Sequence, residues 1–205
     1  MNFAIQHMLA AARFSRRCAE IERENQGKVI DYFFDEVIHC CTAAIFFSVA
    51  SIEANINELF VDSDQHFPNQ TPDLIGEFLE LLKDKPILEK YQSVLVLKDV
   101  SKFDQGRAPY QDVDSLIKAR NALVHFKPEW NDEQKVLKGV GDRLNGKFSL
   151  SPFVDQGEPT FPQRCMSHGC ASWAVRSSLA FMEAFHQAAT LPHKFALFAG
   201  NLDPA

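Results

Sequence analysis

Apolar side chains recur at helical spacing over most of this chain. Residues 4–24 place Ile5, Met8, Leu9 and Ala12 three or four positions apart, which predicts an amphipathic helix. A longer helix is predicted from about Tyr32 to Phe60. Residues 43–50 in its middle are apolar on every side, and this pattern is typical of a helix buried among others.

Prolines and helix-capping residues predict where the remaining helices begin and end. Thr71 is placed as the N-cap of a helix over 73–82, with Pro72 in its first turn. Further helices are predicted over 87–97, from about Asp112 to before Pro128, and over 165–189. We therefore expect a helical bundle of about five helices joined by short connections.

Residues 128–164 differ in composition, because they hold four of the nine glycines and four of the ten prolines. The run 144–147 centres on Asn145–Gly146, which is typical of a two-residue hairpin turn. The full expectation is one all-α domain over residues 1–205, with a small β-hairpin insert at about 128–164. The tail after residue 191 is expected to be peripheral.

Composition narrows the class of protein without naming a function. The net charge of −6 argues against a dedicated duplex-DNA binder, although residues 98–147 hold ten basic against eight acidic side chains. Five cysteines at irregular spacing favour free thiols in a reducing compartment, so we expect a cytoplasmic protein. The longest apolar run, 40–52, ends at Glu53 and is shorter than a membrane span of about 18 to 20 residues, so no membrane association is expected.

The segment 115–128 carries the most informative polar residues. On a helix, Arg120 falls within a stripe formed by Val113, Leu116, Ile117, Leu123 and Val124. A guanidinium on a core-facing stripe is costly unless it is paired or faces a cleft. Asn121 and His125 lie four residues apart, so that the amide could orient the imidazole.

Arg120 and His125 diverge on a single helix, since five residues correspond to about 140° around the axis and about 7.5 Å along it. Either the long Arg120 side chain curls around the helix, or two copies of the helix face each other and bring both residue types into one cleft. The second option predicts a homodimer, which we expect. Such a cleft suits phosphodiester chemistry. His125 would move the proton of a ribose 2′-hydroxyl or of the leaving oxygen, and Arg120 would stabilise the phosphate. This chemistry requires neither a metal ion nor a cofactor.

The run Arg120-Asn121-Ala122-Leu123-Val124-His125, followed by Phe-Lys-Pro, resembles the Arg–polar–x3–His motif of the HEPN superfamily. The segments 51–58 and 173–185 are also consistent with this superfamily, and the resemblance covers about residues 30–190. It implies a dimeric α-helical domain. Many members are metal-independent ribonucleases, often toxins paired with a nucleotidyltransferase-like antitoxin protein.

The resemblance leaves two functions open. One is an endoribonuclease that acts on RNA through Arg120, His125 and Asn121, and the other is a non-catalytic module that binds a nucleotide, an RNA or a partner protein. Glu53 is a candidate buried partner of Arg120 in either case. The alternatives without a functional role are a structural salt bridge from Arg120 to Glu53 or Glu58, and a solvent-facing His125 at the helix end.

A zinc site is the other constellation that the sequence offers. Cys165, His168 and Cys170 supply three ligands within six residues, but a structural site needs four. Residues that cap the N-terminus of the last helix explain this run better.

Overall fold

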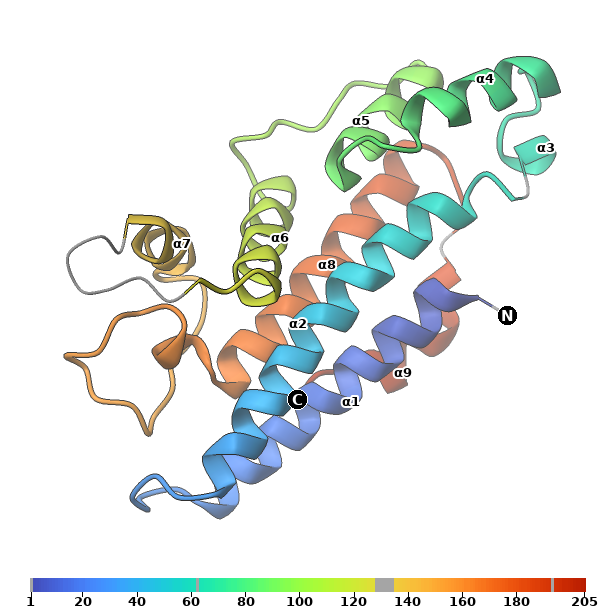
Figure 1. Cartoon of the computed structure of the whole chain (residues 1–205). Helices are drawn as coiled ribbons and strands as arrows, with labels where there is room; N and C mark the ends of the chain where they lie inside the picture. Colours follow the sequence, from blue (N-terminus) through green and yellow to red (C-terminus); the bar gives the residue numbers. More distant parts are fainter. Residues whose placement is uncertain (1, 62, 128–134, 193) are drawn as a thin grey trace.

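Three long helices form the centre of the protein in the computed structural model, which describes residues 2–61, 63–127, 135–192 and 194–205. They are α1 (Phe3–Glu24), α2 (Phe33–Glu58) and α8 (His168–Ala188). Each of the three contacts the other two, and they lie side by side along the length of the molecule (Figure 1). The expected helical bundle is therefore confirmed.

Shorter helices cover one end and one flank of this bundle (Figure 1). At one end lie α3 (Ser63–His66), α4 (Pro72–Leu82) and α5 (Ile87–Leu97). On one flank α6 (Tyr110–Val124) contacts α2 and α8, and α7 (Lys135–Leu144) packs against α6. The 3-10 turn η1 (Gln163–Cys165) precedes α8, whereas η2 (Lys194–Phe198) and α9 (Ala199–Leu202) follow it. The chain thus builds more helical elements than the five we expected.

Local capping explains where several helices begin. The side chain of Asn2 accepts a hydrogen bond from the Ile5 amide, and Ser167 does the same for Cys170. Thr71 accepts from the Leu74 amide at the start of α4, as its spacing before Pro72 predicts. Each cap satisfies an amide that the helix itself leaves without a partner.

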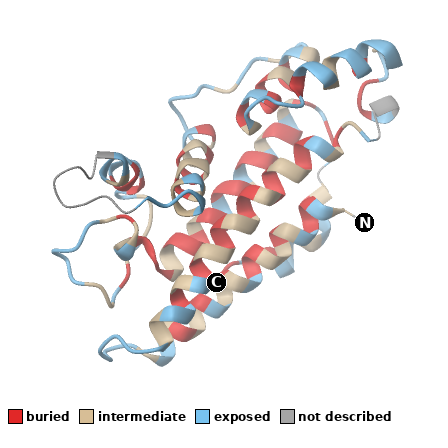
Figure 2. Ribbon diagram, in the orientation of Figure 1, coloured by how far each residue is buried: buried red, intermediate tan, exposed pale blue. Residues whose placement is uncertain are grey.

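The core runs along the facing sides of the three long helices (Figure 2). One part contains Met8, Tyr91 and Phe181, and another contains Ile45 and Leu116. Ile87 and Ile117 pack against both parts, so the two are continuous. In the apolar middle of α2, Ala44, Ile45 and Val49 are buried, whereas Phe46 and Phe47 are only partly buried, so the predicted burial is confirmed in part.

A polar network lies within this core. The Tyr91 hydroxyl donates to the Ile52 carbonyl at 2.8 Å and accepts from the Asn55 amide at 3.0 Å. The ring Nε2 of His186 lies 3.1 Å from the Asn55 Oδ1. Because all three side chains are buried, these contacts replace hydrogen bonds to water and tie α2, α5 and α8 together.

Helix α2 is long and apolar enough to span a membrane, whereas the sequence led us to expect no apolar run of that length. By length and composition alone, this helix could cross a bilayer, with a mean hydropathy of 1.7. Half of that window is buried inside the fold, next to the buried polar residues Ser48, Ser51 and Asn55. Packing between helices therefore accounts for the apolar character of α2.

The structure does not support the hairpin insert, because residues 135–164 form α7 and irregular loops without a strand. Asn145 and Gly146 follow the end of α7, and Gly146 adopts a φ of 75°. The Lys147 amide donates to the Leu144 carbonyl at 3.2 Å. The left-handed residue that a hairpin turn needs thus terminates a helix instead. Residues 128–134 of the predicted insert lie outside the described part.

The tail also differs from expectation, because part of it enters the core. Phe195 and Leu202 are buried against the central helices. Ser15 donates to the Pro204 carbonyl at 2.8 Å, and Arg16 donates to the Asp203 carbonyl at 2.6 Å. Apolar burial and main-chain hydrogen bonds to α1 thus hold a segment that has no periodic pattern of its own.

Candidate functional site

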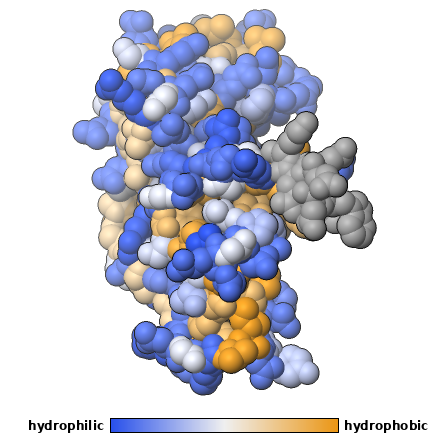
Figure 3. Space-filling model, turned by 90° about the vertical axis from the view of Figure 1, so that its left-hand side faces the viewer, coloured by the Kyte–Doolittle hydropathy of each residue, from blue (hydrophilic) through white to orange (hydrophobic). Residues whose placement is uncertain are grey.

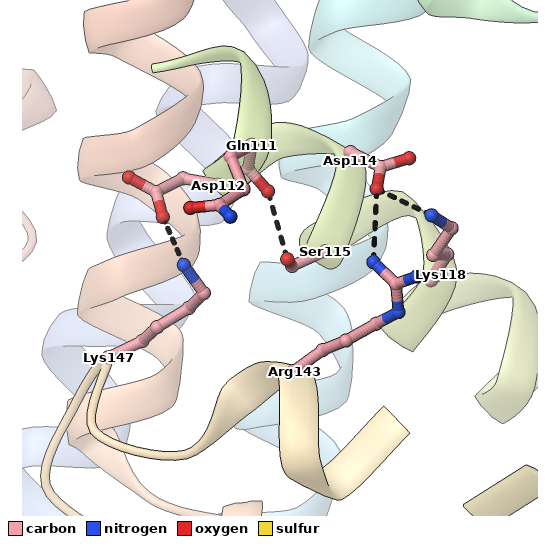
Figure 4. Close-up of polar contacts among 7 residues, drawn as sticks. All are labelled: Gln111, Asp112, Asp114, Ser115, Lys118, Arg143 and Lys147. Atoms are coloured by element: carbon pink, nitrogen blue, oxygen red, sulfur yellow. Dashed lines mark hydrogen bonds and ion pairs between the residues drawn. The ribbon is translucent and has the colours of Figure 1, made fainter. Parts of the chain in front are cut away.

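Helix α6 carries the candidate residues and is held on its flank of the bundle from two sides. Val113, Leu116 and Ala119 are buried against the bundle. On the other side, Asp114 accepts hydrogen bonds from Lys118 at 2.5 Å and from Arg143 of α7 at 3.4 Å (Figure 4).

A second ion pair reaches α6 from the segment after α7. Lys147 donates to Asp112 at 2.5 Å, near the start of α6 (Figure 4). Side chains that are partly exposed gain little from such pairs, so the network orients α6 and α7 more than it stabilises them.

Arg120 is half-buried and lies at the end of the covered stripe. Its Nε atom is buried and has no hydrogen-bond partner. Within the described residues the guanidinium forms no ion pair, whether with Glu53 or with Glu58. This arrangement leaves a cation at the edge of the core without a carboxylate to neutralise it.

Neither proposed acidic partner is engaged with Arg120. The Glu58 carboxylate instead accepts from the amides of Phe3 and Ala4, at 2.6 and 3.1 Å, at the start of α1. Glu53 is half-buried and forms no hydrogen bond within the described residues. The structural salt bridge that we weighed for Arg120 is therefore not formed.

His125 lies just beyond α6, with its side chain exposed. Its backbone amide donates to the Asn121 carbonyl at 2.9 Å, and its ψ of 35° departs from helical geometry. The side chain of Asn121 is exposed as well. The predicted contact between the Asn121 amide and the imidazole is not among the described hydrogen bonds, because the backbone leaves the helix between the two residues.

The last turn of α6 exposes part of the apolar stripe. Val124 and Phe126 keep 47% and 48% of their surface accessible, although the stripe pattern placed Val124 in the core. Figure 3 faces the α6–α7 side of the molecule and shows hydrophobic side chains scattered among hydrophilic ones. The covered part of the stripe thus stops before His125, and the candidate residues lie at its margin.

The zinc candidate separates into residues with other roles. Cys165 and Cys170 are buried free thiols, and the ring Nε2 of His168 lies 3.3 Å from the Pro204 carbonyl. Across the described ranges, no group of three or more His, Cys, Asp or Glu side chains is arranged to hold a metal ion. Ser167 caps α8, in agreement with the interpretation of this run as helix-capping residues.

A convergence of cysteines was not foreseen from the sequence. All five cysteines are buried, and they gather in one part of the core from α1, α2 and the start of α8. Burial raises the pKa of Cys165 to about 12 and raises that of Cys18 further. Buried in this way, the five cysteines act as small core side chains.

Comparison with known proteins adds no relative, since no family model, curated protein or solved structure matches the chain.

Proposed function

We propose that this chain is a HEPN-like protein that cleaves RNA without a metal ion through Arg120 and His125. The observation that carries the proposal is the guanidinium of Arg120, which forms no ion pair with the described residues, five positions before the exposed imidazole of His125. A half-buried arginine that none of the described carboxylates neutralises is available to bind a phosphate, for which its planar donors are well matched. The exposed His125 of a facing copy can exchange protons with a substrate.

In the proposed reaction, two copies of α6 face each other and contribute both side chains to one cleft. A neutral His125 accepts the proton of a ribose 2′-hydroxyl, and the 2′-oxygen attacks the adjacent phosphorus. The bond to the 5′-oxygen breaks, and that oxygen takes a proton from water, while His125 returns its proton to the solvent, so that one His125 and the Arg120 of the other copy are sufficient. The products are a 2′,3′-cyclic phosphate and a free 5′-hydroxyl. Arg120 stabilises the charge on the phosphate oxygens, and Asn121 contacts the substrate beside His125.

A dimer of this kind is supported by the apolar surface at the end of α6. Val124 and Phe126 are exposed beside the two candidate residues, and a second copy would remove them from water. The interface would also bring Arg120 of one copy towards His125 of the other, which one helix alone does not do.

A non-catalytic HEPN-like module is the second candidate, and the exposure of His125 favours it. Proton transfer benefits from a cleft that excludes water, whereas binding of a nucleotide, an RNA or a partner protein can use an open surface. In the catalytic form of the proposal, the protein is cytoplasmic and toxin-like, and an antitoxin protein would cover the same surface.

Cleavage of a labelled RNA in the presence of EDTA tests the catalytic proposal. Wild type should produce fragments that end in a 2′,3′-cyclic phosphate, and His125→Ala and Arg120→Ala should each lose at least about a hundredfold in rate. Two exposed residues of the same types serve as matched controls. His39→Ala and Arg23→Ala should cleave like wild type. Equal activity in all variants, or none in wild type, would leave the binding module as the better account.

A further inference from the structure

A cavity of about 380 Å³ is lined by residues at and just after the end of α2, by residues of α4 and its end, and by Lys90 of α5. Figure 1 shows α4 and α5 at one end of the bundle. The side chains that line it and matter here are Asn57, Phe60, Leu79, Leu82, Lys83 and Lys90. Lys83 and Lys90 are the cationic residues of this lining, and Phe60, Leu79 and Leu82 are its apolar residues. No step of the proposed RNA chemistry uses them.

Lys90 is the unusual residue of this cavity, because only 9% of its surface is exposed. Its Nζ donates to the Asn57 Oδ1 at 3.3 Å, and no carboxylate in the described ranges pairs with it. Burying an ammonium group is costly unless an opposite charge or several hydrogen bonds compensate it. Among the described residues, one neutral amide oxygen is the acceptor for the three donors of the Lys90 ammonium.

The neighbouring charges do not compensate Lys90. Glu80 is the acid in the lining, and Lys83 holds its carboxylate at 2.6 Å. Glu89, which precedes Lys90, accepts from Lys85 at 3.2 Å. Two lysines against one glutamate leave the lining with a net charge of +1.

The apolar part of the lining is packed against further side chains of the protein. The Phe60 ring stacks on Phe67 at a centroid distance of 5.6 Å and lies 6.2 Å from Phe78. Leu82 of α4 is buried next to it. A ligand with an apolar body would therefore meet a formed surface and bury it further.

Helix α4 has few contacts of its own with the bundle. It exposes 44% of Leu74 and 72% of Leu81, and it lies at the margin of the molecule (Figures 1 and 2). A ligand seated between α4 and α5 would bridge the two helices. Binding should then reduce local opening of α4.

We propose that this cavity binds a small amphiphilic monocarboxylate. The carboxylate accepts hydrogen bonds from the ammonium of Lys90 and from the side-chain amide of Asn57. The apolar body lies against Phe60 and Leu82. The charge of the ligand neutralises the excess of the lining, and its tail fits the apolar part of the lining. This inference is independent of the proposed ribonuclease function.

Octanoate is the probe, titrated into the full chain by calorimetry, with octan-1-ol as the neutral molecule of similar shape. Octanoate should bind saturably, and Lys90→Met should weaken it at least about tenfold through the loss of a charged hydrogen bond. Lys85→Met, which removes an exposed lysine on the same side of the fold, should bind like wild type. Octan-1-ol should bind much more weakly than octanoate.

Asn57→Ala gives a second test if Lys90→Met is unfolded, because Asn57 is exposed and its loss leaves the core intact. It should weaken octanoate in the same direction. Hydrogen exchange should slow in 72–82 when octanoate is bound. The proposal is wrong if octanoate does not saturate wild type. It is equally wrong if Asn57→Ala and a folded Lys90→Met keep wild-type affinity, or if octan-1-ol binds as well as octanoate.

Discussion

Substitution of Gly169 by alanine should destabilise the protein, although alanine is the better helix former. Gly169 lies in the first turn of α8, where the segment after α7 crosses it. A Cβ atom at this position would lie 2.3 Å from the Ser149 carbonyl oxygen and 3.0 Å from its amide nitrogen. Ser149 would have to move by roughly 1 Å to restore an ordinary contact.

The size of the change in unfolding free energy follows from two destabilising effects and one stabilising effect. Overpacking of a fitted contact costs about 1 to 3 kcal/mol. The displacement also weakens the hydrogen bond from the Ser167 hydroxyl to the Ser149 carbonyl, now 2.9 Å long, at a cost of about 1 kcal/mol. Helix propensity returns at most about 1 kcal/mol. Gly169→Ala should therefore lower the free energy of unfolding by about 1 to 3 kcal/mol.

Urea denaturation followed by circular dichroism measures this change, with Gly76→Ala as the matched control. Gly76 lies inside α4, and a Cβ there would meet no atom within 4 Å. Its substitution should stabilise the protein by up to about 1 kcal/mol. The two variants should thus shift the unfolding midpoint in opposite directions. A Gly169→Ala protein as stable as wild type would refute the close approach of Ser149 to α8.

Four further outcomes follow from the core and from the α6–α7 contacts. Asn55→Ala removes a partner of the buried Tyr91 hydroxyl and should lower the free energy of unfolding by about 1 to 3 kcal/mol, measured in urea; a loss below the error would contradict the network. Burial raises the pKa of Cys165 to about 12 from an ordinary value of 9.0, so the unfolded thiol ionises first and stability should fall as the pH rises from 9 towards 12. Because all five thiols are buried, they should react with Ellman's reagent at pH 8 only after unfolding, and rapid labelling of the native protein would be the opposite result. Asp112→Asn should cost no more than about 1 kcal/mol and less at high salt, because the pair with Lys147 is only partly buried; a salt-independent loss would argue against it.

The helices of this protein could be predicted well because their signals are local. Thr71 and Pro72, which predict the start of α4, lie at that start. The apolar spacing that predicts α1 lies within the 22 residues of that helix. Asn145–Gly146 misled the prediction because a left-handed residue serves a hairpin turn and a helix end equally well. What decides between the two is the structure of the residues before the turn.

Burial that depends on distant segments could not be predicted in the same way. The residues after 191 show no period, yet Phe195 and Leu202 fill space beside the central helices. The five cysteines looked unrelated along the sequence, but α1, α2 and α8 bring them into one part of the core. In the sequence, Lys90 resembles an ordinary charged residue of a helix. Its enclosure depends on α4 and Asn57, which the sequence around Lys90 does not show.

The candidate site shows the same division between local and distant information. The position of Arg120 on the apolar stripe follows from helical geometry, and the structure finds it half-buried. That Glu58 is engaged at the start of α1 and not with Arg120 could not be predicted, because this contact joins residues 55 positions apart. The exposure of Val124 depends on where the bundle ends.

The most direct test of the proposed catalytic site is complementation between two inactive variants. Arg120→Ala and His125→Ala proteins are each assayed alone and as an equimolar mixture on a labelled RNA with EDTA. A site shared between two copies predicts that each variant is inactive alone and that the mixture regains cleavage, with 2′,3′-cyclic phosphate ends. A mixture that stays inactive beside an active wild type would contradict the shared cleft, and an inactive wild type would contradict RNA cleavage itself.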